Sequence, residues 1–188
     1  DLQQLSAFLQ EAFTGYHLIE ISCGTGYWTE KIAATAASIF ATDINERMLD
    51  IARQKDYPRE NVQFGIADFY SFETNKLYEG LLGGFIWSHI PLQDLPAFLG
   101  KISRFVKPGG KVVFTDNNYV EGSNTAIAET DAEGNTYQRR QLENGDTYLV
   151  RKNFPAEAFL RQQLVAFSDV VTYHHFPYYW VVIYTVKS

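Results

Sequence analysis

The sequence predicts an α/β protein in which helices cover both faces of a mostly parallel β-sheet. Short apolar runs alternate with amphipathic helical patterns over residues 2–115, and such alternation requires crossover connections between parallel strands. Polar residues follow several of these runs at their carboxyl ends, where an open parallel sheet binds ligands. After residue 117 the pattern changes to a polar segment and a hairpin. Together these features predict a three-layer α-β-α sandwich with a β-hairpin insertion after the fifth strand.

Five strands and four helices are predicted in the first part of the chain. The strands are expected at 18–21, 38–42, 62–66, 81–87 and 111–115, each a run of mainly apolar residues. Apolar residues at helical spacing predict helices over 2–13, 28–36, 46–52 and 95–106. Asn45 is a good N-cap for the third of these helices. The inner face of that helix is expected to carry Met48, Leu49, Ile51 and Ala52.

The second part of the chain is predicted to hold the insertion, one helix and two closing strands. Strands at 136–142 and 147–151 flank Glu143-Asn144-Gly145-Asp146, which is typical of a hairpin with an Asn-Gly turn. Pro155 suits the first position of a helix. The alternating segments 169–173 and 180–186 predict the closing strands. We expect a single domain over residues 1–188, with the hairpin insertion at about 117–153.

Charge and cysteine content argue against several classes of function. The formal net charge is −6 and the only basic doublet is Arg139-Arg140, so the sequence lacks the clustered cations that follow a phosphate backbone. A single cysteine rules out an internal disulfide framework and fits a reducing cytoplasm. No apolar run reaches membrane-spanning length, and no Glu and His stand at metal-binding spacing. We therefore expect a cytoplasmic protein with no nucleic-acid or membrane partner and no metal.

A glycine-bearing turn, Ser22-Cys23-Gly24-Thr25-Gly26, separates the first strand from the helix that follows. Gly24 and Gly26 admit backbone conformations closed to other residues and let a ligand approach the main chain. The unpaired N–H groups at the start of the next helix favour a polar or anionic ligand group. This turn is therefore expected to bind a ligand.

Further polar signals stand at the ends of later strands, namely Asp43, Asp68, Ser88-His89 and Asp116. The carboxyl ends of parallel strands converge on one ligand site. A nucleoside fits such a site, since Asp43 can accept both ribose hydroxyls and Asp68 can accept from the exocyclic amine of adenine. Taken alone, Asp43 is equally compatible with a helix cap and Asp68 with a turn. Their placement at successive strand ends favours the nucleoside.

Two kinds of nucleoside cofactor compete for this site. A dinucleotide needs G-x-G-x-x-G, whose third glycine permits close packing of the helix on the strand. In that register Ser22 takes the first glycine position and Tyr27 the third, which disfavours a nucleotide-dependent oxidoreductase. The spacing Glu20-x-Ser22-x-Gly24-x-Gly26 instead resembles the first motif of class I S-adenosylmethionine-dependent methyltransferases.

The resemblance covers roughly residues 19–115 and depends on a set of motifs. Besides the glycine turn, these are Asp43 followed by Glu46-Arg47-Met48-Leu49, the pair Ala67-Asp68, and Val106-Lys107-Pro108-Gly109-Gly110. Two positions depart from the family pattern. Ser22 replaces the usual first glycine, and Glu20 replaces the commoner aspartate. Neither is expected to prevent cofactor binding, because serine is small and the carboxylate is kept.

The resemblance implies the strand order 3-2-1-4-5-7-6 with the seventh strand antiparallel, S-adenosyl-L-methionine as cofactor and S-adenosyl-L-homocysteine as product. It implies that Glu20 and the turn face the methionine part, that Asp43 holds the ribose, and that Asp68 holds the adenine amine. The expected cofactor-binding residues are Glu20, Ser22, Cys23, Gly24, Gly26, Asp43, Ile44, Met48, Ala67, Asp68, Phe69 and Ser88. Tyr27, Trp28 or Trp87 can offer a cation–π face to the sulfonium, although core packing is the simpler explanation of both tryptophans.

Methyl transfer from a sulfonium is an in-line displacement that depends on alignment of donor and acceptor. His89 is the expected general base if the acceptor must lose a proton, and a structural histidine is the alternative. The expected acceptor is a small molecule with an oxygen or nitrogen nucleophile. A protein or peptide methyltransferase, favoured if Asp94, Asp116 and Glu121 form an acidic rim, is one alternative. A non-catalytic cofactor-binding module is the other.

The predicted hairpin carries Tyr137, Arg139, Arg140 and Tyr148. The resemblance implies that it lies where such enzymes place elements that cover the substrate. Its basic pair can attract a small molecule that bears a carboxylate or a phosphate. An ordinary solvated hairpin with half-buried tyrosines explains the same residues, and the sequence alone does not decide between the two.

Overall fold

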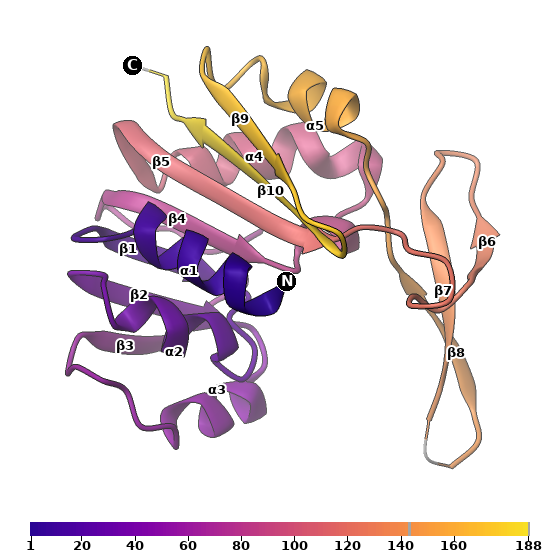
Figure 1. The fold of residues 1–188 in the computed structure, drawn as a ribbon, viewed down its shortest axis with the longest axis horizontal. Helices are drawn as coiled ribbons and strands as arrows, with labels where there is room; N and C mark the ends of the chain where they lie inside the picture. The colour runs from indigo at the N-terminus through magenta and orange to yellow at the C-terminus, as the bar shows by residue number, and fades with distance from the viewer. Residues whose placement is uncertain (143, 188) are drawn as a thin grey trace.

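The structure, a computed structural model, describes residues 1–142 and 144–187 and contains two β-sheets (Figure 1). The large sheet has seven strands in the order β3-β2-β1-β4-β5-β10-β9, and helices cover both of its faces. The small sheet has three antiparallel strands in the order β6-β7-β8. The large sheet confirms the predicted α/β class and the predicted strand order.

Five parallel strands make up most of the large sheet. They are β1 (His17–Ile21), β2 (Ser38–Asp43), β3 (Val62–Ile66), β4 (Tyr78–Gly84) and β5 (Val106–Asn117). Strand β10 (Tyr179–Thr185) runs antiparallel to β5 and to β9 (Val171–His175). The bounds of β9 and β10 lie within two residues of their predicted positions. The first five strands therefore end along one side of the sheet, which we call the carboxyl edge.

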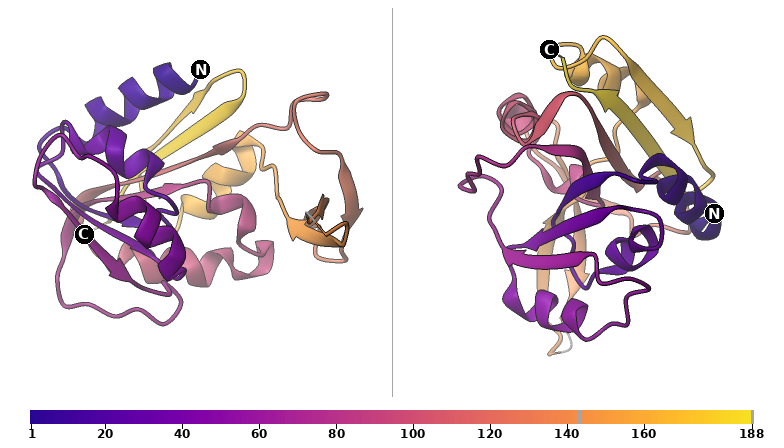
Figure 2. Two further views of the ribbon diagram at one scale, coloured as in Figure 1. Left: turned by 90° about the horizontal axis from the view of Figure 1, so that it is seen from below. Right: turned by 90° about the vertical axis from the view of Figure 1, so that its left-hand side faces the viewer.

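Strand alternation divides the core between two layers of helices (Figure 2). Helices α1 (Leu2–Ala12), α2 (Tyr27–Ala33) and α3 (Glu46–Arg53) cover one face, and α4 (Leu95–Ser103) and α5 (Glu157–Leu164) cover the other. On β1, Leu18 packs in the cluster of α1 and α2, whereas Ile19 packs in the cluster of α4, because successive strand residues point to opposite faces. Both side chains are fully buried, which stabilises the fold by about 1.5–3 kcal/mol each.

Three of the element boundaries that differ from the predictions have local reasons. Strand β4 ends at Gly84 and not at Trp87, because Phe85 adopts a φ of +58° and Trp87–His89 form a 3₁₀ helix, η1. Helix α4 ends at Ser103, and Val106, predicted to close it, begins β5. Pro155 precedes the first helical position, since α5 begins at Glu157 after Ala156 as N-cap.

Helix α3 has the predicted cap but a narrower buried face. The Asn45 side chain accepts a hydrogen bond from the Arg47 N–H at 3.1 Å, as an N-cap does. Leu49 and Ala52 are buried, whereas Met48 and Ile51 are 37% and 48% exposed. The prediction that Met48 and Ile51 face inward is therefore wrong. Only Leu49 and Ala52, three residues apart on one side of the helix, pack toward the sheet.

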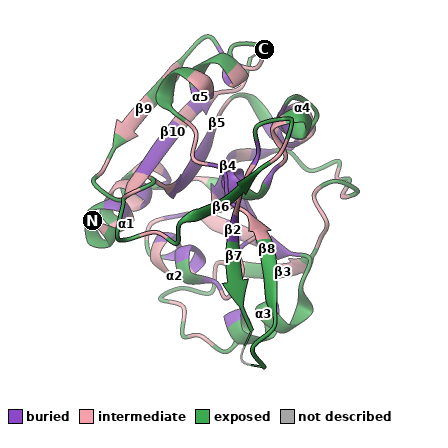
Figure 3. Cartoon of the chain, turned by 90° about the vertical axis from the view of Figure 1, so that its right-hand side faces the viewer, coloured by how far each residue is buried: buried purple, intermediate pink, exposed green. Residues whose placement is uncertain are grey.

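The predicted insertion is a three-stranded sheet. Strands β7 (Thr136–Gln141) and β8 (Thr147–Arg151) confirm the two predicted strands, and β6 (Ile127–Thr130) adds a third inside the segment predicted to be irregular. Every residue of β6 is exposed, so hydrophobic alternation gives no sign of it. Glu143 of the predicted Asn-Gly turn lies outside the described residues. The small sheet projects from the carboxyl edge (Figure 1). Most residues at its far end are exposed (Figure 3).

Candidate functional site

The glycine turn after β1 is bonded to the end of β2. The Gly24 N–H donates to Asp43 Oδ2 at 2.8 Å, and the Cys23 N–H donates to the Thr42 carbonyl at 2.9 Å. Asp43 Oδ1 accepts from the Asn45 N–H at 2.8 Å, so this carboxylate joins the turn to the N-cap of α3. Asp43 is 8% exposed, and each of its oxygens has a second lone pair that can accept from a ligand hydroxyl.

The turn adopts left-handed backbone conformations at Ser22, Gly24 and Gly26, with φ of +52°, +55° and +75°. A Cβ on Gly26 would lie 2.8 Å from the Tyr57 hydroxyl and 3.0 Å from Ala52 Cβ, so glycine is required there. Ser22 holds a conformation that costs an L-residue about 1–2 kcal/mol. The predicted turn therefore forms with serine at the first glycine position, and this backbone strain lies at a candidate ligand site.

Glu20 lies beneath the turn. It is 1% exposed, and its Oε2 accepts from Thr29 Oγ1 at 2.6 Å, which ties β1 to the first turn of α2. Burial raises the pKa of Glu20 to about 8; the bond from Thr29 opposes this rise and the nearby Asp43 adds to it. Glu20 was expected to face the methionine part of a cofactor. Thr29 occupies one of its two carboxyl oxygens, and the contact of Glu20 with a cofactor stays a prediction.

Asp68 and Ala67 follow β3 next to the end of β2. The Ala67 N–H donates to the Asp43 carbonyl at 3.0 Å, which joins the two strand ends. Asp68 Oδ1 accepts from the Tyr70 N–H at 3.0 Å, and this short turn fixes the direction of the carboxylate. Asp43 and Asp68, predicted separately from the sequence, are thus brought to neighbouring positions on the carboxyl edge.

Apolar side chains flank these two aspartates. Ile44 and Met48 are 67% and 37% exposed, and Phe69 is half-buried with its ring 5.1 Å from that of Phe98. Exposed apolar groups beside a few convergent polar ones are typical of a small-molecule site. The exposure of Met48, which contradicts its predicted place in the core, is compatible with its predicted place in the site.

Ser88 belongs to a buried ion-pair network between the two sheets. Lys152 Nζ donates to Asp116 Oδ1 at 2.7 Å and to Ser88 Oγ at 2.8 Å. Asp116 Oδ2 accepts from the Ser88 N–H at 3.0 Å, and Ser88 and Asp116 are both 0% exposed. The Ser88 hydroxyl is thus bonded to Lys152, and its expected contact with the cofactor stays a prediction. Sequence reasoning missed Lys152; the signal was Asp116, an acid at the end of a buried strand that needs a cation.

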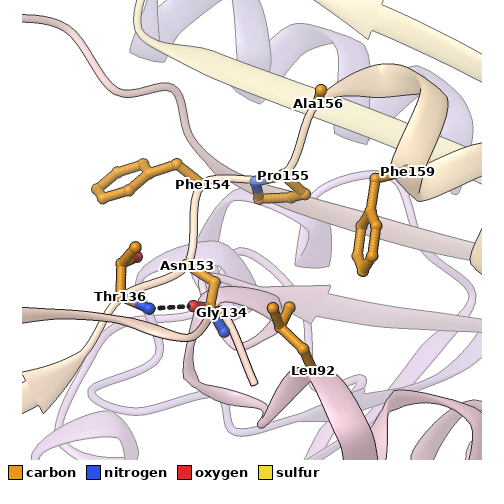
Figure 4. Close-up of a pocket in the computed structure, with 8 residues that line it drawn as sticks. All are labelled: Leu92, Gly134, Thr136, Asn153, Phe154, Pro155, Ala156 and Phe159. Atoms are coloured by element: carbon orange, nitrogen blue, oxygen red, sulfur yellow. Dashed lines mark hydrogen bonds between the residues drawn. The ribbon is translucent and has the colours of Figure 1, made fainter. Parts of the chain in front are cut away.

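Asn153 strengthens the attachment of the small sheet. Its N–H donates to the Ser88 carbonyl at 2.9 Å, and its Oδ1 accepts from the Thr136 N–H at 2.8 Å (Figure 4). Its Nδ2 donates to the Ile90 carbonyl at 3.2 Å. A mostly apolar cavity of about 230 Å³ lies beside it. The cavity is lined by Leu92, Gly134, Thr136, Asn153, Phe154, Pro155, Ala156 and Phe159 (Figure 4).

His89 is exposed at the end of η1, five residues beyond the end of β4. Arg151 Nη1 donates to its carbonyl at 3.3 Å. Partial desolvation of the ring and the nearby Lys152 cation lower the pKa of His89, against the opposing effect of Asp116. The imidazole is therefore mainly neutral at pH 7, which is the form that a general base requires.

The aromatic residues considered for a cation–π contact differ in their access. Trp87 is 1% exposed and packs with its ring 5.1 Å from that of Phe114, so it belongs to the core. Trp28 is 4% exposed and packs against Gly84, where a Cβ would lie 2.6 Å from Trp28 Cδ1. Tyr27 is 40% exposed and remains open to a ligand.

The part of the chain that the structure describes contains no group of three or more His, Cys, Asp or Glu side chains placed to hold a metal ion. None of the described helices is long and apolar enough to cross a membrane. Where β1 to β4 end, the carboxyl edge presents the glycine turn, the Asp43 and Asp68 carboxylates, exposed apolar groups and the His89 imidazole.

Comparison with protein families agrees with this geometry. A family model described as a methyltransferase domain matches residues 18–110. This match identifies residues 18–110 as a methyltransferase domain. The methyltransferase domain runs from β1 into β5 and holds the glycine turn, Asp43, Asp68 and His89, whereas the small sheet lies outside the match.

Two curated relatives and one solved structure share this domain or its fold. Malonyl-[acyl-carrier protein] O-methyltransferase 2 of Ilyobacter polytropus is 27% identical over 116 residues, 60% of this chain and 43% of the relative. Demethylmenaquinone methyltransferase of Staphylococcus aureus is 32% identical over 104 residues, 53% of this chain and 42% of the relative. This chain thus spans less than half the length of both. The structure of a DhpI-SAH complex matches the fold with a TM-score of 0.77 at 24% identity, over 99% of this chain and 82% of that one.

Proposed function

We propose that this chain binds S-adenosyl-L-methionine at the carboxyl edge and transfers the methyl group to an oxygen or nitrogen of a small-molecule acceptor. S-adenosyl-L-homocysteine is the second product. The observation that carries the proposal is the 2.8 Å bond from the Gly24 N–H to Asp43 Oδ2, which brings a glycine turn and a ribose acceptor into one site. The methyltransferase domain and the two curated relatives, both named as methyltransferases, support it.

The residues present suit a sulfonium nucleoside. Asp43 would accept from the ribose hydroxyls and Asp68 from the adenine amine, with Ile44 and Met48 covering the nucleoside. Among the described residues, neither Asp43 nor Asp68 forms an ion pair with Lys or Arg, so an acidic edge faces a cationic ligand. The backbone of the glycine turn would bind the methionine part. Glu20 would act through Thr29, by holding α2 in place under the turn.

The cofactor, when bound, supplies an electrophilic methyl group, and the chain supplies alignment and proton removal. Holding donor and acceptor in line contributes about 7–11 kcal/mol to such reactions. His89 would take the proton of an acceptor hydroxyl or ammonium at the open end of η1, in its neutral form. The small sheet, bonded through Lys152 and Asn153, would form the wall on the acceptor side.

A peptide acceptor is less well supported. A basic peptide would be favoured by an acidic rim, for which the sequence offers Asp94, Asp116 and Glu121. Asp116 is 0% exposed and paired with Lys152 at 2.7 Å, so it offers no charge to a ligand. Only Asp94 and Glu121 of that set are exposed.

Residues 1–188 are also proposed to act as one unit. The basis is the bonding of Lys152 and Asn153 in the insertion to Asp116 and Ser88 on the large sheet. A cytoplasmic location stays a prediction from the single cysteine and is part of the same proposal.

Calorimetry and mass spectrometry test the proposed function. S-adenosyl-L-homocysteine should bind the chain and raise its melting temperature by mass action, whereas NAD should do neither. Incubation of S-adenosyl-L-methionine with pooled metabolites should then give products heavier by one methyl group. Binding of NAD in preference to the homocysteine product would contradict the proposal. Cofactor binding without any methylated product would favour the non-catalytic module.

A further inference from the structure

One face of the small sheet is directed toward the carboxyl edge. Lys152 follows β8, and its side chain reaches Asp116 on β5 at 2.7 Å. In an antiparallel pair, directly opposite residues share a face and alternate residues along a strand share it too. The register pairs Arg140 with Tyr148 and Gln138 with Val150. We call the set on the Lys152 side the inner face: Gln138, Arg140, Tyr148, Val150 and Lys152.

The neighbouring residues of the same strands form the outer face. Arg139 and Leu149 are opposite one another and alternate with Arg140 and Tyr148. Arg139 Nη2 lies 3.2 Å from Glu129 Oε1, so its charge is paired. The two arginines of the basic doublet therefore occupy opposite faces of the sheet, and the outer one has a carboxylate partner.

Among the described residues, Arg140 has no such partner. Its Nη2 donates to Gln138 Oε1 at 3.1 Å, and within the described residues no carboxylate lies at ion-pair distance from its guanidinium. Arg140 and Lys152 both lie near enough to His89 to lower the pKa of the imidazole. A cation near the candidate base that has no carboxylate partner among the described residues attracts an anionic ligand, and the net charge of −6 does not cancel this local potential.

We propose that the methyl acceptor carries an oxyanion, a carboxylate or a phosphate-type group, and that Arg140 of the inner face binds it. This inference rests on the proposed function and names the acceptor class for the same site. A guanidinium binds both kinds of oxyanion through paired N–H donors. Lys152 contributes positive potential and one N–H donor not used by Asp116 or Ser88. Tyr148, which is 47% exposed, packs on the body of the acceptor.

An anion titration tests this without knowledge of the acceptor. The full chain, saturated with S-adenosyl-L-homocysteine, is titrated with inorganic phosphate and, separately, with acetate, while NaCl holds the ionic strength constant. NMR follows the His89 ring signals. At least one anion should produce a saturating shift with a Kd of about 10 mM or tighter. Whether phosphate or acetate binds more tightly decides which oxyanion the site prefers.

Matched variants on the two faces locate the anion. Arg140→Gln should weaken anion binding by about tenfold or more, since it removes a charge-assisted pair. Arg139→Gln removes the same charge one residue away on the outer face and should change the Kd by less than about twofold. Unmoved His89 signals with both anions, or equal effects of the two variants, would overturn the proposal. Failure of S-adenosyl-L-homocysteine to bind would instead refute the proposed function, and the same titration of the chain alone would still report on Arg140.

A second pair of variants tests the aromatic contact once a methylated acceptor is known. Tyr148→Ala on the inner face should raise the KM for the acceptor by about three- to tenfold and leave the affinity for S-adenosyl-L-homocysteine unchanged. Leu149→Ala on the outer face should leave both unchanged. A neutral or cationic preferred acceptor would contradict the proposal directly.

Discussion

The Gly24 N–H and Asp43 Oδ2 lie 2.8 Å apart and bond the turn after β1 to the end of β2. The second oxygen of Asp43 accepts from the Asn45 N–H, so one carboxylate sets the position of the turn and of the α3 N-cap together. A hydrogen bond to a charged group contributes about 1.5–3 kcal/mol. The glycine turn is therefore shaped before any ligand arrives.

Gly26→Ala should disrupt both the fold and ligand binding. The new Cβ would meet Tyr57 and Ala52 at 3.0 Å or less, in addition to the strain of a φ of +75°. We expect a loss of about 2–4 kcal/mol in the free energy of unfolding and a weaker affinity for S-adenosyl-L-homocysteine. Gly15→Ala is the matched control, because Gly15 has a φ of +77° but nothing within 4 Å of the added Cβ. Gly15→Ala should lower the free energy of unfolding by only about 1–2 kcal/mol and leave the affinity for S-adenosyl-L-homocysteine unchanged. Equal losses of unfolding free energy in the two variants would contradict this prediction.

Glu20→Gln should remove a pH dependence of stability. The folded-state pKa of about 8 lies above the unfolded value, so the folded chain retains a proton that the unfolded chain releases. Stability contributed by Glu20 is therefore present at low pH and is lost as pH rises through about 8. The free energy of unfolding of Glu20→Gln, relative to wild type, should rise from about pH 4.5 upward and level off above pH 8. The total rise should reach roughly 5 kcal/mol. Urea unfolding across this range measures it, and a constant difference would refute it.

Lys152 and Asp116 should show strong energetic coupling. Lys152→Met leaves the 0% exposed Asp116 without its cation and should cost about 3–5 kcal/mol of unfolding free energy. The double variant Lys152→Met, Asp116→Asn should be more stable than Lys152→Met alone, because no uncompensated charge is left buried. Denaturant unfolding of the four species gives the coupling energy. Simple addition of the two single effects would show that the ion pair contributes nothing beyond packing.

His89 should set the acid limb of the rate profile. Its pKa lies below the ordinary value, so the imidazole is neutral above that pKa and the rate should fall only as pH drops below about 6.5. His89→Ala should lower kcat by about 10²–10⁴-fold if proton removal limits the reaction, with the affinity for S-adenosyl-L-homocysteine unchanged. Methylation by His89→Ala at the wild-type rate at every pH would remove His89 from the mechanism.

The large sheet could be predicted because its signals are local. The run from Leu18 to Ile21 places apolar residues on both faces of the sheet, and the polar residue Asp43 stands where β2 ends. Asn45 could be identified as a cap because the side chain that satisfies the helix N–H is its own. In each case the physical cause lies within a few residues of the feature.

The remaining features depend on contacts far apart in sequence. Lys152 is separated from Asp116 by 36 positions, and nothing in its own neighbourhood marks it as buried. Strand β6 is exposed throughout and forms only because β7 offers its edge. The early end of β4 follows from the positive φ of Phe85, which no residue preference predicts for phenylalanine.

The affinity of Asp43→Ala for S-adenosyl-L-homocysteine, measured by calorimetry, tests the central claim most directly. Asp43 is 8% exposed and joins the turn to the proposed ribose site, so the variant should bind at least about tenfold more weakly than wild type. Asp50→Ala removes an exposed aspartate of α3 that pairs with Arg53, and this variant should bind as wild type does. Equal affinity of wild type and Asp43→Ala, or no binding by wild type at millimolar ligand, would contradict the account.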